Sequence, residues 1–111
     1  MEFNADELAK QLDSSTTSDR LDPRLSMIDE KGMQKAYMIL TAEERAKGFV
    51  RPYRDSYIHK TCGVVTRMSQ SISETYARQP SFYSGTYCVS CQAHLPLTEF
   101  VWDGTNEQVG S

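Results

Sequence analysis

The sequence predicts a small α+β domain of β-hairpins with one inserted helix, preceded by an N-terminal arm. Three observations predict it. Residues of metal-ligating type occur in two pairs, His59/Cys62 and Cys88/Cys91, each with two residues between its members. β-Branched and aromatic residues flank the pairs, as in the strands of hairpins. Between the pairs, residues 69–78 have the pattern of a helix that stops at a following proline.

The two pairs have the spacing of a structural zinc site. Zinc in such sites takes four tetrahedral nitrogen and sulfur ligands, and two intervening residues let a tight turn point both side chains of a pair at one ion. All three cysteines of the chain fall within this set. We therefore expect one zinc per chain, in a zinc-ribbon-like fold, bound by His59, Cys62, Cys88 and Cys91.

One neighbouring residue leaves the ligand set open. His94 follows Cys91 with ligand spacing, so it is an alternative ligand or a residue that supports the ligands from outside. The turns also differ, because Gly63 follows the first pair and favours positive φ, whereas Gln92 stands at the equivalent place after the second. The second turn is therefore expected to depart from the usual pattern.

Residues 1–35 are predicted to be an N-terminal arm and linker, and residues 36–111 the zinc-binding domain. Within the arm, residues 4–12 have the spacing of a short helix, and the small polar residues of 13–19 indicate a linker. An extended segment is expected at 36–40. Residues 41–44 form a capping box, and the helix that it starts should end at Gly48.

The zinc-binding domain is predicted to contain strands on both sides of the first ligand pair, at 57–58 and 64–66. Residues 69–78 are the clearest helix, with Ser69 or Ser71 as its N-terminal cap. Residues 95–97 and 100–102 alternate into a further strand, and a tight turn follows at 103–104. Val109 is expected to pair back on a strand edge.

Composition favours a protein of a reducing compartment. The chain has 111 residues, a formal net charge of −3 and no apolar run long enough to span a membrane. Its first residues lack the pattern of a secretory signal, and an odd cysteine count argues against a disulfide framework. Positive charge is concentrated in residues 45–67, which could contact nucleic-acid phosphates through Arg45, Lys47, Arg51, Arg54, Lys60 and Arg67.

No motif indicates catalysis. A nucleobase deaminase needs a glutamate two residues after its histidine ligand, and Thr61 stands there. A zinc-dependent hydrolase is the alternative that the sequence leaves open, with Glu74, Glu99 and His94 as the groups that could act beside an open zinc. Because four protein ligands are already predicted, we expect no enzyme activity.

The spaced motifs of residues 40–111 resemble those of small, generally uncharacterised proteins encoded by tailed bacteriophages and prophages. The resemblance rests on GFVRP at 48–52, YIHKTCG at 57–63, ETYAR at 74–78, FY at 82–83, YCVSC at 87–91, EFVWDG at 99–104 and VGS at 109–111. It implies a phage origin and action in the cytoplasm of the bacterial host. It implies no activity, substrate or catalytic residue.

These inferences together predict a non-enzymatic zinc-binding protein that docks on a macromolecule of the bacterial cell. A host protein complex, such as a defence or transcription machine that the protein would inhibit, is the favoured partner, and a phage protein is also considered. We expect no membrane partner and no small-molecule substrate. The alternative is a zinc ribbon that binds nucleic acid through the basic stretch 45–67.

Overall fold

The structure is a computed structural model that describes residues 16–111. Within this range, short strands combine with two α-helices, so the predicted α+β class is confirmed. The helix predicted over 4–12 lies outside the described residues. No helix in the described range is both long and apolar enough to cross a membrane.

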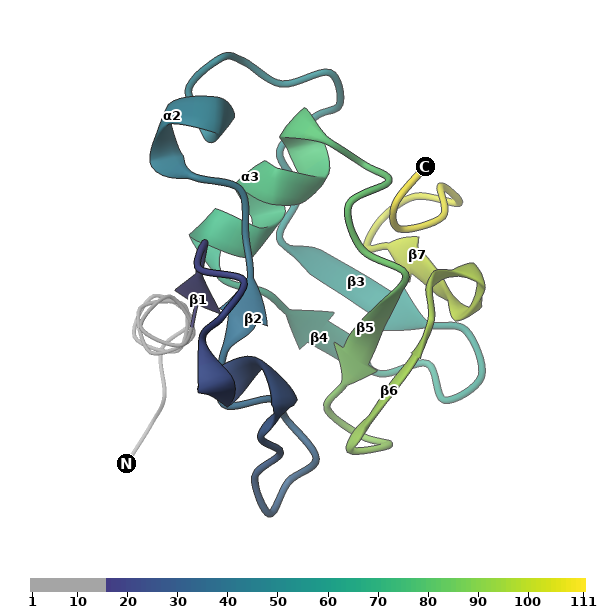
Figure 1. Cartoon of the computed structure of the whole chain (residues 1–111). Coiled ribbons are helices and arrows are strands. Elements are labelled where there is room, and N and C mark those ends of the chain that lie inside the picture. Colours follow the sequence, from purple (N-terminus) through teal and green to yellow (C-terminus); the bar gives the residue numbers. More distant parts are fainter. Residues whose placement is uncertain (1–15) are drawn as a thin grey trace, which may run out of the picture.

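A three-stranded antiparallel sheet carries the first predicted ligand pair (Figure 1). Its order is β4–β3–β7, with β3 at Ser56–His59, β4 at Val65–Arg67 and β7 at Phe100–Trp102. β3 and β4 form the hairpin that the sequence predicts around His59 and Cys62, and the first of these residues ends β3.

A separate two-stranded hairpin carries the second pair. Its strands are β5 at Gly85–Cys88 and β6 at Ala93–Pro96. A 3₁₀ turn, η2 at Leu97–Glu99, then separates β6 from β7. The single strand predicted over 95–102 is therefore divided between two sheets. The turn is needed because β6 pairs with β5, whereas β7 pairs with β3.

Both helices begin with a side-chain cap. In α2, Ala42–Arg45, the Thr41 hydroxyl accepts a hydrogen bond from the backbone N–H of Glu44 at 3.2 Å. In the capping box predicted at 41–44, however, the Glu44 carboxylate pairs with Lys47 and Arg78 rather than with the backbone of Thr41. In α3, Gln70–Arg78, the Ser69 hydroxyl accepts from the N–H of Ile72 at 3.3 Å. Each cap satisfies a backbone donor that has no partner within its helix.

An aromatic core joins the sheet, α3 and the β5–β6 hairpin. The ring of Trp102 makes edge contacts with the rings of Tyr57 and Tyr76, whose centroids lie 6.4 and 5.5 Å away. Near the C-terminus, the N–H of Val109 donates to the carbonyl of Phe100 at 3.1 Å, which confirms the predicted pairing. The core cluster consists of Tyr57, Met68, Tyr76, Cys88, Leu97, Phe100, Trp102 and Val109.

Residues 16–38, called the strap below, run along one side of the molecule, and the C-terminus lies near β7 (Figure 1). The strap contains β1 at Thr16–Thr17, the 3₁₀ helix η1 at Pro23–Ser26 and β2 at Tyr37–Met38. β1 pairs with β2 in parallel, although 13–19 is predicted to be a linker. Backbone pairing of this kind needs no apolar side chain, so the polar composition did not indicate it.

Two tyrosine hydroxyls attach the strap to the second hairpin and its approach. Tyr87 donates to the carbonyl of Lys31, and Tyr83 donates to the carbonyl of Met38, both at 2.6 Å. Through Lys31, the predicted arm thus contacts the predicted zinc-binding domain. The division of the chain at residue 35 stays a prediction.

Candidate metal centre

The first ligand pair sits in the turn of the β3–β4 hairpin. His59 is the last residue of β3, and Cys62 follows in the turn. The chain reverses because the N–H of Gly63 donates to the carbonyl of His59 at 2.7 Å. Gly63 has φ of +72°, a conformation that glycine adopts without steric cost.

The second pair repeats this arrangement. Cys88 is the last residue of β5, Cys91 follows in the turn, and the N–H of Gln92 donates to the carbonyl of Cys88 at 2.8 Å. Gln92 has φ of +52°, so it takes the left-handed conformation of Gly63 despite its side chain. The expectation that the second turn departs from the pattern is therefore wrong for the backbone. The reversal requires the conformation, and glycine is only the residue that adopts it most readily.

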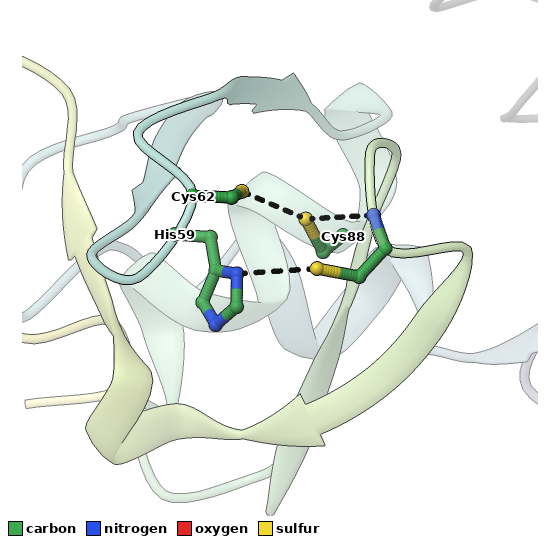
Figure 2. A group of neighbouring side chains, drawn as sticks. His59, Cys62 and Cys88 are labelled. Atoms are coloured by element: carbon green, nitrogen blue, oxygen red, sulfur yellow. Dashed lines mark hydrogen bonds between the residues drawn. The ribbon is translucent and has the colours of Figure 1, made fainter.

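The two turns bring four donor atoms together (Figure 2). The ligand atoms of His59, Cys62, Cys88 and Cys91 all lie within 4.8 Å of one another. The sulfur of Cys62 is 3.6 Å from that of Cys88, and the sulfur of Cys91 is 3.5 Å from Nδ1 of His59. This cluster could hold one metal ion.

The cluster lies at the edge of the core. His59 and Cys88 are buried, whereas Cys62 and Cys91 are exposed. The buried sulfur of Cys88 accepts a hydrogen bond from the N–H of Cys91 at 3.4 Å. A backbone donor of this kind stabilises a thiolate, which is the form that binds metal.

Glu99 orients the imidazole from outside the cluster. Its Oε1 lies 2.8 Å from Nε2 of His59, while Nδ1 of the same ring faces the sulfur of Cys91. The ring is also held by the side chain of Phe100, with centroids 4.9 Å apart. With Nε2 donating to the carboxylate, Nδ1 is left as the free nitrogen for a metal.

The sequence offered Glu99 only as a candidate catalytic group. Its actual place follows from strand pairing, because β7 sets Phe100 opposite His59 and so puts the preceding residue beside the ring. The N–H of Lys60 also donates to the carbonyl of Glu99 at 2.9 Å. Nothing in the local sequence indicates a partner so distant in the chain.

The groups of the cluster shift one another's ionisation. Burial raises the pKa of Cys88, but hydrogen bonds from the backbone N–H groups of Cys91 and Ser90 and from the Cys62 thiol outweigh it, so the net pKa is lowered. A hydrogen bond to the sulfur of Cys88 raises the pKa of Cys91 to about 11. The hydrogen bond to Glu99 raises the pKa of His59.

His94 does not join the cluster. It lies on β6 opposite Tyr87, and its Nε2 is 2.9 Å from the hydroxyl of Tyr37 on the strap. Burial lowers its pKa. The alternative in which His94 replaces a ligand is thus not the arrangement that the structure shows.

Most of the predicted basic stretch is neutralised by ion pairs. Four of its six basic side chains form ion pairs with nitrogen–oxygen distances of 2.7–3.0 Å: Arg45–Glu74, Lys47–Glu44, Arg54–Glu107 and Arg67–Asp55. Arg51 has no such pair among these and donates from Nε to the carbonyl of Ser111 at 3.2 Å. The structure does not bring these residues together as one free positive face.

The three side chains considered as catalytic groups beside an open zinc each contact a different partner. Glu99 contacts His59, Glu74 pairs with Arg45 at 2.7 Å, and His94 contacts Tyr37. Glu74 is thus part of the junction between α2 and α3.

The geometry of the cluster is the basis for assigning a function. Comparisons of the chain with models of protein families, with curated proteins and with solved structures found no match. The resemblance to phage-encoded proteins remains an expectation of the sequence.

Proposed function

We propose that the cluster holds one structural zinc ion and that the domain is zinc-ribbon-like. The observation that carries this proposal is that four donor atoms, three sulfurs and one nitrogen, lie within 4.8 Å of one another. Three thiolates and one imidazole form a usual ligand set for structural zinc. Soft sulfur ligands disfavour magnesium and calcium, which take oxygen.

A structural role is favoured over a catalytic one. Catalytic zinc keeps a position open for water or substrate, whereas this cluster offers four protein ligands. The two hairpins already contact each other next to the cluster. Besides the cluster, the N–H of Val89 donates to the hydroxyl of Thr66 on β4 at 3.1 Å, so the second turn already rests against the first hairpin. A shared ion would complete that junction.

We propose further that the domain is a non-enzymatic binding module for a protein of the bacterial cell, with a host complex as the favoured partner. Three apolar side chains stand exposed in one short loop, with exposed fractions of 46% for Phe49, 55% for Val50 and 44% for Tyr53. Exposed aromatic side chains are enriched at protein interfaces. Residues 49–53, called the apolar loop below, therefore support a protein partner.

Nucleic-acid binding is the second candidate function. The stretch 45–67 offers less free positive charge for it than the sequence predicts. Free lysine and arginine side chains bind phosphates, but four of the six basic residues considered are in ion pairs. Binding of this kind must weaken steeply as salt rises. A purified, zinc-loaded chain that binds neither DNA nor RNA at low salt would exclude this candidate.

Elemental analysis tests the metal. We expect one zinc per purified chain, and cobalt in its place should give thiolate charge-transfer absorption together with the visible bands of tetrahedral coordination. The control variant Ser90→Ala should keep its zinc, because Ser90 lies between two of the cysteines but is not among the four donors. A well-ordered chain without metal would contradict the proposal.

The partner is tested by affinity capture from bacterial lysate, with and without nuclease, using the zinc-loaded full chain. We expect a protein that survives nuclease, that binds again after purification, and that is lost with the variant Phe49→Ala/Val50→Ser. Leu21→Ser is the matched control, because Leu21 is 89% exposed and lies on the strap instead. Loss of every bound protein on nuclease treatment would favour nucleic acid.

A further inference from the structure

An apolar cavity lies between the strap and the body of the domain, and none of the four candidate metal ligands lines it. Its volume is about 500 Å³. The strap lines it with Leu25, Met33 and Tyr37, and α3 lines it with Ile72 and Tyr76. Residues of β4 and β5 complete the wall. Cavities of roughly 300–1,000 Å³ with mainly apolar linings are typical of small-molecule sites.

Most polar groups of the wall are already engaged with the protein. The Tyr57 hydroxyl donates to the carbonyl of Tyr87 and accepts from the hydroxyl of Thr86. The hydroxyl of Tyr37 lies 2.9 Å from Nε2 of His94. A ligand in this space would therefore meet methyl groups and ring faces rather than free donors.

The wall also offers little charge. Its cation, Arg67, forms an ion pair with Asp55 at 3.0 Å. A charged ligand would lose hydration without gaining a free counter-charge, which is strongly unfavourable. The lack of a free charge in the wall therefore favours an uncharged ligand.

The strap is held over the cavity partly by polar contacts. The Tyr83 and Tyr87 hydroxyls donate to strap carbonyls at Met38 and Lys31, both at 2.6 Å. Such hydrogen bonds can exchange with water at small net cost, whereas apolar space left unfilled lowers stability in proportion to its volume. A ligand that fills the cavity should therefore stabilise the strap in its place over it, and a strap in that place should strengthen binding of the ligand.

We propose that this cavity binds an uncharged, mainly apolar small molecule beneath the strap. None of the four candidate metal ligands lines the cavity, and no residue of the apolar loop does. The sequence predicted no small-molecule ligand, because the lining of the cavity comes from segments far apart in the chain.

The methionines make the proposal testable within one sample. Met33, Met38 and Met68 line the cavity, whereas Met27 does not. In the full chain with ¹³C-labelled methionine methyls, titration with the uncharged probe N-phenyl-1-naphthylamine should shift the first three signals saturably. The Met27 signal should stay in place.

Fluorescence of the same probe, excited beyond tryptophan absorption, measures affinity in variants that fill the space. Met33→Trp and Ile72→Trp, one on each wall, should each weaken binding at least tenfold. Leu21→Trp is the control, because this residue is 89% exposed and does not line the cavity. Metal content and melting temperature show which variants remain folded.

Three outcomes would overturn the proposal. One is no saturable binding by the full chain. Another is binding that persists in every folded variant with a filled cavity. The third is probe binding that appears only after Leu8 and Leu12 are replaced by serine, since the chain's own first residues would then be the occupant.

Discussion

The two ligand turns share a backbone but differ in their surroundings. Both start at the last residue of a strand, and both end in a left-handed residue whose N–H bonds back to the first ligand. Gly63, which ends the first, has open space where a Cβ would be. Gln92, which ends the second, has its carbonyl covered by Gly32 of the strap. Ligand spacing therefore determines the shape of a turn, whereas tertiary packing determines how much substitution the turn tolerates.

The largest expected effect comes from removing a ligand of the proposed zinc from either turn. Cys88→Ser and Cys62→Ser should each abolish stoichiometric zinc binding and unfold residues 57–102. Structural zinc contributes about 10–16 kcal/mol of apparent binding energy, as much as the whole stability of a typical domain. Cys88→Ser should be the more severe, because Cys88 is buried in the core and Cys62 is exposed. Circular dichroism and zinc content measure both, and an unchanged melting temperature would contradict the prediction.

The next largest difference between the turns should appear when a glycine beside each turn is replaced by alanine. Gly32→Ala forces a Cβ into the carbonyl of Gln92 at φ of +82°, so we expect a loss of about 2–4 kcal/mol in the free energy of unfolding. Gly63→Ala adds only the backbone cost, about 1–2 kcal/mol, since nothing lies within 4 Å. Urea unfolding of the zinc-loaded chain tests the order. Equal losses of unfolding free energy in the two variants would mean that the strap does not pack tightly against the second turn.

The turns also differ in what supports their first ligand. His59 depends on the Glu99 side chain, whereas Cys88 accepts from the backbone N–H of Cys91. Glu99→Ala should weaken metal binding about 10–100-fold, the usual effect of removing a partner of a ligating histidine. Glu99→Gln, which keeps an acceptor, should lose less. Competition with a zinc chelator measures both, with Glu107→Ala as control, and equal affinity in all three would exclude the role assigned to Glu99.

The smallest effect is expected from giving the second turn the residue of the first. Gln92→Gly removes the strain of a left-handed residue with a Cβ but adds freedom to the unfolded chain. The two terms oppose each other, so the unfolding free energy should change by less than about 1 kcal/mol. A larger loss in urea unfolding would show that the Gln92 side chain has a contact of its own.

Local elements followed the sequence closely. The caps at Thr41 and Ser69, the hairpin around His59 and the return of Val109 all form as predicted, because each depends on short-range hydrogen bonding or on strand alternation. The break between β6 and β7 was missed. Alternation continues through residues 95–102 and does not show that the strand changes partner.

By itself, the sequence determined the two pairs of candidate ligands, the first turn and the helix between the pairs, since each is set by residues a few positions apart. Only the tertiary structure decided that Glu99 holds His59, that His94 bonds to Tyr37 instead, and that the strap covers an apolar cavity. Each of these joins residues from different sheets or segments. Their meeting depends on how whole elements pack, and spacing along the chain carries no record of that packing.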